Sequence, residues 1–406
     1  MNDNQISLLT AGRDKPYALG LATALAVAGM KVDFIGGNEL DSPELRGNPQ
    51  INFLNLRGDQ SVDAGLLQKM ARVLVYYFRL IFYAATARPK VFHILWNNKF
   101  EFFDRTMLML YYKLLGKKII LTAHNVNIGE RDGNDSFLNR LSLKIQYRLC
   151  DHIFVHTEKM KDELVSAFGN SEKKASVIPL GINNTVPNTT LSGLEARQRL
   201  GLGRADKAIL FFGSIAPYKG LEYLVAAFAT IARRNSSYRL VIAGKPKGRV
   251  DYWTEIRELI AGSGTGDRII QKIEFVPDAE TEVFFKAADV LVLPYTHIFQ
   301  SGVLFLGYSF GLPVIAANVG SLKEEIFEGK TGFVFEPKNA AALARTIENY
   351  FESYLHRELD SRRTEIQNFA NERYSWSKVA AITTAVYSKL LPAEKHFSAH
   401  YFPEKS

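Results

Sequence analysis

The sequence predicts an α/β protein made of two doubly wound domains, each a parallel sheet with helices on both faces. Short apolar runs alternate with helix-like segments over residues 6–179, and the alternation starts again at Ala208. Residues 180–193, between the two series, are rich in Asn, Thr, Gly and Pro, which is a linker composition. Strand–helix alternation is typical of parallel sheets. A single sheet would need about a dozen strands, more than sheets usually have.

The first domain is expected over residues 1–185. Its predicted strands are short apolar runs, at residues 6–11, 31–36, 51–56, 91–96, 118–123, 152–156 and 175–179. Its predicted helices space apolar residues three or four apart, at residues 16–29, 65–87, 102–115, 137–149 and 158–168.

The second domain is expected over residues 186–375, with a tail at residues 376–406. The predicted strands are residues 208–212, 238–243, 270–275, 290–294, 313–316 and 333–335. The predicted helices are residues 221–234, 253–261, 281–287, 304–311, 323–328 and 340–355. The tail contains a last predicted helix, residues 377–391, which could pack on either domain.

Composition narrows the classes of partner. The net charge is +8, from 50 basic and 42 acidic side chains, which favours anionic partners such as phosphates or an acidic membrane. No basic stripe with interleaved aromatic residues is present, so we do not expect a nucleic-acid-binding protein. We see no signal peptide and no apolar run of membrane-spanning length, and we expect a cytoplasmic protein.

Two loops predict an anion site. Residues 211–220 (FFGSIAPYKG) and 296–313 (THIFQSGVLFLGYSFGLP) each follow an apolar strand and turn through small residues into a helix. A helix N-terminus offers unpaired N–H groups and the positive end of the helix dipole. Two such turns on one sheet indicate a single phosphate-containing ligand at the carboxyl ends of the strands.

Four segments carry a family resemblance, in the family's order: residues 177–183 (VIPLGIN), 211–228, 289–316 and 319–337. Together they resemble the donor domain of GT-B glycosyltransferases, specifically the large family 4 of nucleotide-sugar-dependent enzymes. The resemblance implies two Rossmann-like domains that face each other across a cleft, with the donor bound by the second.

Two further segments are similar to parts of the same family. Residues 120–126 (ILTAHNV) are similar to a strand end with His-Asn in the first domain, where the family usually binds its acceptor. Residues 374–387 resemble a tail helix that crosses back to the first domain.

The implied reaction is transfer of a sugar from a nucleoside diphosphate, UDP rather than GDP, to a hydroxyl group. By resemblance, the acceptor is a glycan or lipid-linked glycan in cell-surface polysaccharide synthesis, and the outcome is retaining. No Asp-x-Asp occurs in the sequence, so we expect neither a metal ion nor another cofactor.

The main electrostatic demand of this reaction is negative charge growing on the leaving diphosphate. Lys219 matches the family's phosphate-binding lysine and is the first catalytic candidate, with Gln300 and His124 as the others. Backbone N–H groups at the start of the 304–311 helix are expected to bind the same diphosphate. The full set of donor-site candidates is Gly213, Ser214, Lys219, Gly244, Lys245, Val276, Thr296, His297, Gln300, Ser301, Gly302 and Val303.

The chain departs from the family at three donor positions. Ser214 stands where many members have an Arg, and Ile298 and Leu306 align with a pair of Glu residues seven apart. Lys245, Lys247 or Arg249 could replace the missing cation, and Gln300, His297 or Thr296 the missing sugar contact. These departures keep a second hypothesis open, a catalytically silent relative that acts as a scaffold or nucleotide-sugar sensor.

The acceptor site is expected at the carboxyl edge of the first sheet. Gly12, Arg13 and Lys15 follow the first strand and could hold an acceptor phosphate, and His124 and Asn125 follow the fifth. His124 has a suitable ordinary pKa for a general base, although it could equally be a structural histidine. Asp14 and Glu130 are weaker candidates on the same edge.

The predicted helix at residues 65–87 is apolar, aromatic and basic. It could lie on an acidic membrane interface, which would suit a lipid-linked acceptor, or it could be a core helix between two strands. His152 and His156 lie in an apparent strand and lack the Glu of a zinc motif, so we expect packing rather than metal binding.

Overall fold

Two parallel sheets organise the chain in the computed structural model, which describes residues 4–60, 65–127, 129, 135–169, 172–182, 186–247, 250–298 and 300–391. The first sheet has seven strands in the order β3-β2-β1-β4-β5-β6-β7, and the second has six in the order β10-β9-β8-β11-β12-β13. The predicted fold class, two doubly wound α/β domains, is therefore confirmed. The boundary expected near residue 185 lies outside the described residues.

The N-terminal domain follows the predicted alternation. Its strands are β1 (Gln5–Leu9), β2 (Lys31–Gly36), β3 (Ile51–Asn55), β4 (Val91–Ile94), β5 (Lys118–Thr122), β6 (His152–Val155) and β7 (Ala175–Val177). Its α-helices are α1 (Lys15–Val27), α2 (Pro43–Arg46), α3 (Leu66–Thr86), α4 (Glu101–Phe103), α5 (Met109–Leu114), α7 (Phe137–Leu149) and α8 (Glu158–Phe168). Short 3₁₀ turns η1 (Asn38–Leu40) and η3 (Glu172–Lys174) and a π-helical turn η2 (Asp104–Leu108) complete it.

The C-terminal domain repeats the architecture. Its strands are β8 (Lys207–Phe212), β9 (Tyr238–Ala243), β10 (Ile269–Lys272), β11 (Val290–Leu293), β12 (Val314–Ala317) and β13 (Gly332–Phe335). Its helices are α9 (Gly193–Arg199), α10 (Leu221–Arg234), α11 (Val250–Gly262), α12 (Asp278–Ala287), α13 (Gly302–Ser309), α14 (Leu322–Glu325), α15 (Ala340–Glu352) and α16 (Tyr354–Arg357), with 3₁₀ turns η4 (Pro217–Lys219) and η5 (Gly266–Arg268). The last two helices of the chain are α17 (Leu359–Arg373) and α18 (Trp376–Leu390).

The structure differs from the sequence prediction most clearly at three places. The helix expected at residues 102–115 is divided by η2 into α4 and α5, and α9 forms directly after the expected linker, where Ser192 and Glu195 make a capping box. Helix α17 was not predicted because it is mostly polar: of its 15 residues, Leu359, Ile366 and Ala370 are the buried ones.

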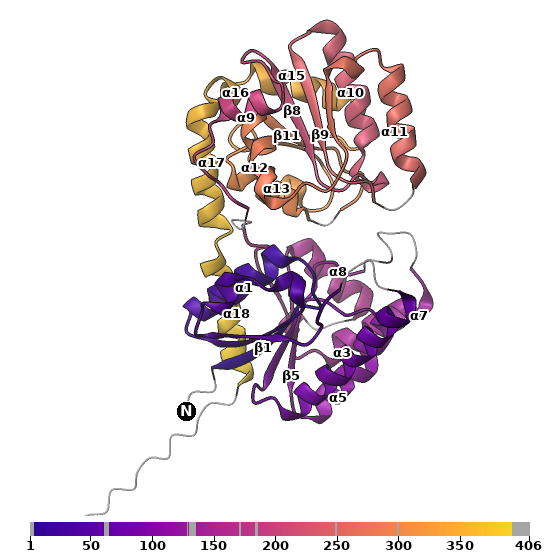
Figure 1. Cartoon of the computed structure of the whole chain (residues 1–406), viewed down its shortest axis with the longest axis vertical. Coiled ribbons are helices and arrows are strands. Elements are labelled where there is room, and N and C mark those ends of the chain that lie inside the picture. The colour runs from indigo at the N-terminus through magenta and orange to yellow at the C-terminus, as the bar shows by residue number, and fades with distance from the viewer. Residues whose placement is uncertain are drawn as a thin grey trace, which may run out of the picture.

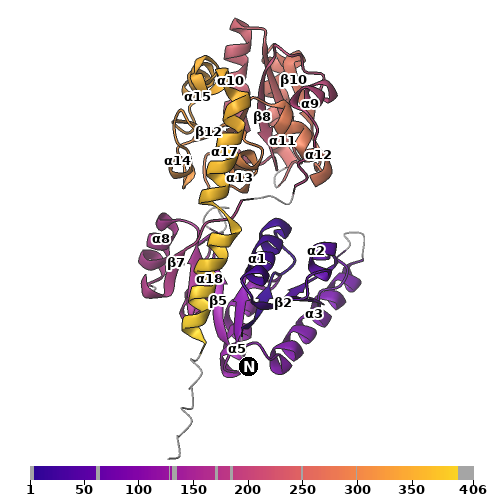
Figure 2. The same ribbon diagram turned by 90° about the vertical axis from the view of Figure 1, so that its left-hand side faces the viewer.

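The two domains are connected by the tail as well as by the linker. Figure 2 shows α17 running along the upper domain and α18 continuing along the lower one. Helix α18 packs on α1, and its Val379 and Tyr387 belong to the same apolar core as strands β1 and β4. The protein therefore buries part of the N-terminal core beneath the last helix of the chain.

Each sheet has one point where the strand order reverses direction, between β1 and β4 and between β8 and β11. Ligands of open α/β sheets bind at such switch points, outside the carboxyl ends of the strands. In Figure 1, α13 lies on the side of the upper domain that faces the lower domain, and α1 lies on the opposing side of the lower domain. The loops after β1, β4, β8 and β11 are therefore the places to look for the site.

Candidate active site

The loops after β8 and β9 approach each other at two glycines. Gly213 has φ +105° and Gly244 has φ +153°, and a Cβ atom on Gly244 would lie 1.8 Å from the carbonyl oxygen of Gly213. The Gly213 N–H donates to the Ala243 carbonyl at 2.9 Å, and the Ile215 N–H donates to the Lys245 carbonyl at 2.9 Å. The sequence has glycine at both positions because no other residue allows this approach without strain.

Lys219 is buried at the end of η4, where it contacts the loop after β11. Its Nζ donates to the Tyr295 hydroxyl at 2.6 Å and lies 4.1 Å from the centre of the Tyr295 ring. The Tyr295 hydroxyl lies 3.2 Å from Oγ of Ser301, the N-cap residue of α13. The predicted phosphate-binding lysine and the predicted helix N-terminus are thus joined through one buried tyrosine.

The same two loops are also held together by their backbones. The Thr296 N–H donates to the Tyr218 carbonyl at 2.9 Å. Gly220 has φ +63°, and a Cβ atom there would lie 2.0 Å from the Pro294 carbonyl oxygen. Loop β8–α10 and loop β11–α13 therefore form one rigid unit at the switch point.

The start of α13 presents polar groups beside this unit. Ser301 is buried, Gly302 is exposed and Val303 is half-buried. The Oε1 atom of Gln300 is buried without a hydrogen-bond partner among the described residues. An unpaired buried amide oxygen is costly, so Gln300 has an unused acceptor at the start of α13.

The remaining donor-site candidates are more dispersed. Ser214 is half-buried in the loop after β8, Lys245 and His297 are exposed, and Val276 packs in the domain core. Ile298 and Leu306, at the positions aligned with the family's Glu pair, also pack in that core. Arg249, a possible replacement cation, lies outside the described residues.

In the N-terminal domain, a pocket with a volume of about 140 Å³ lies at the carboxyl edge of the first sheet. It brings together Arg13, His124 and Asn125 from the predicted acceptor site. Its lining does not include Gly12 or Lys15. The pocket is also lined by polar residues that we did not predict, namely Asn97, Glu101, Arg105 and Gln146, and by the aromatic residues Trp96 and Tyr147. The sequence could have indicated Trp96 and Asn97 as pocket residues, because they follow β4 at the same carboxyl edge of the sheet.

His124 is held between aromatic rings. Its ring stacks on Trp96 at 4.2 Å between centroids, and its Nδ1 lies 2.9 Å from Nε2 of His156. Burial, and then the neighbouring His156, holds the pKa of His124 well below its usual range. His124 is therefore neutral at physiological pH and weakly basic, and its buried Nε2 has no partner among the described residues.

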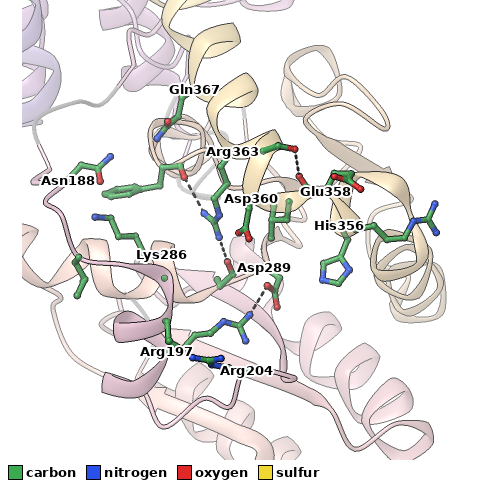
Figure 3. A pocket seen from close by; sticks show the side chains of 18 residues that line it. Asn188, Arg197, Arg204, Lys286, Asp289, His356, Glu358, Asp360, Arg363 and Gln367 are labelled. Atoms are coloured by element: carbon green, nitrogen blue, oxygen red, sulfur yellow. Dashed lines mark hydrogen bonds and ion pairs between the residues drawn. The ribbon is translucent and has the colours of Figure 1, made fainter.

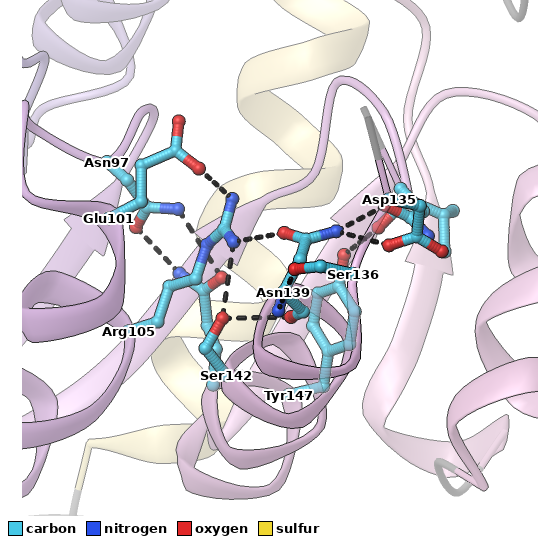
Figure 4. Close-up of polar contacts among 11 residues, drawn as sticks. Asn97, Glu101, Arg105, Asp135, Ser136, Asn139, Ser142 and Tyr147 are labelled. Carbon is cyan, nitrogen blue, oxygen red and sulfur yellow. Dashed lines mark hydrogen bonds and ion pairs between the residues drawn. The ribbon is translucent and has the colours of Figure 1, made fainter. Parts of the chain in front are cut away.

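The opposite wall of this pocket is a polar network around Arg105, shown in Figure 4. The Arg105 guanidinium donates to Asn139 Oδ1 at 2.7 Å and to Glu101 Oε2 at 2.5 Å. Asn139 in turn donates to Asn127 Oδ1 at 2.9 Å and to Asp135 Oδ1 at 2.7 Å. The π-helical turn η2 directs Arg105 inward, and π-turns are often found at functional sites.

The loop after β1 is shaped by unusual backbone conformations. Ala11, Gly12 and Asp14 all have positive φ, at 50°, 67° and 43°. Asp14, one of the weaker base candidates, accepts the Tyr17 N–H at 3.3 Å and caps α1. The other weaker candidate, Glu130, lies outside the described residues.

A larger cavity lies away from these loops, at the amino-terminal edge of the second sheet. It has a volume of about 960 Å³, and Figure 3 shows its charged lining. Arg197 pairs with Asp289 at 2.7 Å, and Arg363 donates to the carbonyls of Phe285, Phe310 and Ala288. Because these cations hold α9 and α17 in place, we assign this cavity a structural role.

The described residues contain no cluster of three or more His, Cys, Asp or Glu side chains placed to bind a metal ion. His152 begins β6 and His156 directly follows it; both are buried, and burial lowers the pKa of each to about 4.

Comparison with known proteins identifies both halves of the chain. Residues 16–186 match the family described as Glycosyltransferase Family 4, and residues 206–353 match the family described as Glycosyl transferases group 1. The chain is 29% identical over 275 residues to an uncharacterized glycosyltransferase of Methanocaldococcus jannaschii, covering 66% of this chain and 68% of that protein. It is 31% identical over 216 residues to a D-inositol 3-phosphate glycosyltransferase of Acidothermus cellulolyticus, covering 52% of this chain and 48% of that protein. The matched region therefore spans about half to two thirds of these relatives.

Solved structures show the same fold across the whole chain. Sucrose-phosphate synthase from Thermosynechococcus elongatus superposes with a TM-score of 0.75 at 19% identity, covering 95% of this chain and 99% of that one. HepE from Anabaena, solved in complex with UDP, superposes with a TM-score of 0.72 at 17% identity, covering 95% of this chain and 100% of that one. The chain therefore belongs to the glycosyltransferases of family 4, also described as group 1, and has the GT-B fold.

Proposed function

We propose that this protein transfers a sugar from a nucleoside diphosphate to a hydroxyl group, with the donor bound at the β8–β11 switch point. The observation that carries this proposal is the buried chain from Lys219 through Tyr295 to Ser301 at the start of α13. It places a cation beside a helix N-terminus, the two elements that best bind a diphosphate. HepE from Anabaena, a structural neighbour, has been solved with UDP and with UDP-glucose, which favours UDP as the nucleotide.

In the proposed reaction the bond between the anomeric carbon and the diphosphate breaks as a bond to the acceptor oxygen forms. The diphosphate gains negative charge, and Lys219 with the α13 N–H groups would stabilise that charge. The acceptor proton must go to a base or to the leaving phosphate. Because burial lowers the pKa of His124 far below neutral, His124 is a poor proton acceptor. We therefore favour a retaining reaction in which the leaving phosphate takes the proton.

The acceptor is proposed to bind in the pocket formed by His124, Asn125, Arg13 and the Arg105 network. Its amide side chains and the Glu101–Arg105 pair offer donors and acceptors in a small volume, which suits the hydroxyl groups of a sugar. We propose a glycan or lipid-linked glycan of cell-surface polysaccharide synthesis as the acceptor. The protein would then act at the inner face of the cytoplasmic membrane.

Substitution of Lys219 tests this proposal. Lys219→Ala should lower turnover at least about 100-fold, the scale expected for loss of a group that stabilises transition-state charge. Lys330→Ala is the matched control, because Lys330 is exposed in the same domain at the opposite edge of the sheet. Normal turnover in Lys219→Ala would remove this residue from the mechanism.

The donor can be identified without knowing the acceptor. Calorimetric titration of UDP, GDP and ADP into wild-type protein, in the presence of a chelator, should give binding of UDP that Lys219→Ala loses. A strict metal requirement would contradict the proposal. Binding of UDP without turnover of any UDP-sugar would favour the alternative of a silent relative, for which the supporting observation is that the apolar Ile298 and Leu306 pack against and in the core.

A further inference from the structure

Large apolar side chains are exposed mainly on one part of the N-terminal domain. Among the described residues, all exposed large hydrophobic side chains except Val27, Leu259, Phe275, Phe327 and Tyr354 lie between Leu66 and Leu141. Exposed patches of this extent mark an interaction site. The sequence predicted this possibility for the helix at residues 65–87 alone, whereas the structure extends it to three further helices.

Helix α3 is apolar on two sides. One side is buried in the domain core through Tyr76, Tyr77, Leu80 and Ala84. The other side is open to solvent and carries Leu67, Met70, Leu74, Phe78, Ile81 and Phe82, of which Phe78 is 72% exposed. A helix with large apolar side chains on its outer as well as its inner side needs a second apolar environment in addition to the core.

Helices α4, α5 and α7 extend the same surface. Tyr77 of α3 stacks on Phe100 at the start of α4, and Tyr111 of α5 donates to the Ile81 carbonyl of α3 at 3.1 Å. Figure 1 shows α3, α5 and α7 on the same side of the domain. The exposed side chains on these added helices are Phe102, Phe103, Leu110, Leu114, Phe137 and Leu138.

The charge of this surface is basic. Helices α3, α5 and α7 contain Lys and Arg residues but no Asp or Glu, and the one acidic residue of α4, Glu101, pairs with Arg105. Some of these cations pair with acids on neighbouring segments, such as Lys113 with Asp151 at 2.8 Å. Lys144 and Arg148 on α7 form no ion pair with any side chain that the structure describes. Long basic side chains beside exposed Phe and Leu are typical of a helix lying on an anionic membrane.

We propose that the outer faces of α3, α4, α5 and α7 form one docking surface for a bilayer that contains anionic lipid. Its apolar side chains enter the acyl boundary, and its basic side chains meet the lipid phosphates. No described helix is long and apolar enough to span a bilayer, so the contact is interfacial. A second copy of the chain fits less well, because a two-fold contact would set the same basic surface against itself.

The docking surface also explains how an acceptor could reach its pocket, a point that rests on the proposed function. Helix α7 has Leu143, Gln146 and Tyr147 in the acceptor pocket on its inner side. Its outer side presents Phe137 and Leu138 to solvent, at 79% and 60% exposure. One helix therefore separates the pocket from the proposed membrane, so a lipid-linked acceptor would have only a short distance to cross.

Vesicle binding tests the docking surface without donor, acceptor or turnover. Wild-type protein should co-sediment with phosphatidylcholine vesicles that contain phosphatidylglycerol, and more weakly with phosphatidylcholine alone. Phe78→Asp should weaken this binding at least about tenfold, since it removes one buried aromatic side chain from the bilayer. Phe275→Asp is the matched control: Phe275 is also 72% exposed, but it lies in the other domain.

A charge reversal separates the electrostatic contribution to vesicle binding from the apolar contribution. Lys144→Glu with Arg148→Glu should reduce binding to the anionic vesicles, and raised salt should reduce wild-type binding in the same way. Thermal unfolding of each variant checks that the protein is folded. Equal vesicle binding by Phe78→Asp and Phe275→Asp would overturn the proposal. A wild-type dimer that Phe78→Asp dissociates, with no vesicle binding by either protein, would also overturn it in favour of a self-association surface.

Discussion

At the scale of single residues, the N-terminal domain is unusual in burying several neutral histidines. His93 lies 2.6 Å from the Tyr387 hydroxyl and 2.8 Å from Thr122 Oγ1, and burial lowers its pKa to about 3. Burial likewise lowers the pKa of His152 and of His156 to about 4, and holds that of His124 well below its usual range. These rings are therefore held uncharged in the folded state and become basic again when the chain unfolds.

This arrangement predicts acid-sensitive stability. The unfolded histidines bind protons below about pH 6.5 and the folded ones do not, so their stabilising contribution is complete above that pH and lost as the pH falls towards 4. At pH 5 protonation of His93, His152 and His156 in the unfolded chain should each lower the free energy of unfolding by roughly 2 kcal/mol relative to pH 7. Burial raises the pKa of Asp104 to about 6. Between pH 7 and pH 5 the folded protein therefore binds a proton at Asp104 that the unfolded chain does not, which raises the free energy of unfolding by about 1 kcal/mol and offsets part of the histidine effect.

Calorimetric unfolding between pH 7 and pH 5 measures this effect. The unfolding temperature should fall with pH, and His156→Gln, which cannot titrate, should show a shallower dependence than wild type. An unfolding temperature that does not change over this range would contradict the assignment of neutral buried histidines.

Residue-scale prediction from the sequence reaches only the positions that a motif marks. The loop motif pointed to Lys219 and Ser301, but Tyr295, which joins them, is visible only when the loops after β8 and β11 are folded against each other. In the same way, His156 is separated from His124 by 32 positions, and the sequence predicts that His156 packs in the fold but not that it contacts His124. Side-chain environment depends on contacts between distant segments, and spacing along the sequence does not report it.

At the scale of elements, the proposed donor site depends on two loops that approach each other at glycine residues. Gly244→Ala should be strongly destabilising, because its Cβ would lie 1.8 Å from the Gly213 carbonyl oxygen and its φ of +153° is unfavourable for alanine. We expect a cost of about 3 kcal/mol or more, the range for strain combined with a steric clash, together with weaker UDP binding.

The control for this prediction is Gly262→Ala in α11 of the same domain. A Cβ atom on Gly262 would meet no atom within 4 Å, and alanine is the better helix former. Stability should therefore stay the same or rise slightly, as measured by denaturant unfolding of both variants. Equal stability of Gly244→Ala and wild type would show that the two loops can separate freely.

Elements with a strong periodic pattern were predictable, and α7, α8, α10 and β9 begin and end where the sequence indicated. Helix α17 was missed because its buried residues are few and its stabilising contacts are polar, such as Arg363 donating to the carbonyl oxygen of Phe310 at 3.2 Å. The π-turn η2 could not be predicted either, since its Asp104 and Arg105 are buried by partners on α3 and α7.

At the scale of the whole molecule, the point where the tail crosses between domains is closely packed. The Trp376 indole N–H donates to the Ile182 carbonyl at 2.9 Å, and the ring lies against Tyr17 at 5.4 Å between centroids. Cβ atoms on Gly20 and Gly181 would lie 2.2 Å and 2.6 Å from this ring. One side chain of the tail therefore contacts both the first helix of the N-terminal domain and the linker.

Trp376→Ala should for this reason separate donor binding from catalysis. The cavity and the unpaired carbonyl should lower the unfolding free energy by about 3 kcal/mol. The donor loops lie entirely in the C-terminal domain, so UDP affinity should be nearly unchanged, whereas turnover requires both domains in register and should fall at least about tenfold. Trp253→Ala is the matched control, because it removes a tryptophan within the C-terminal domain alone. In this variant any loss of turnover should be accompanied by a similar loss of UDP affinity, unlike in Trp376→Ala. If the two variants lose UDP affinity and turnover in the same proportion, Trp376 supports stability alone and the orientation of the domains is set by the linker.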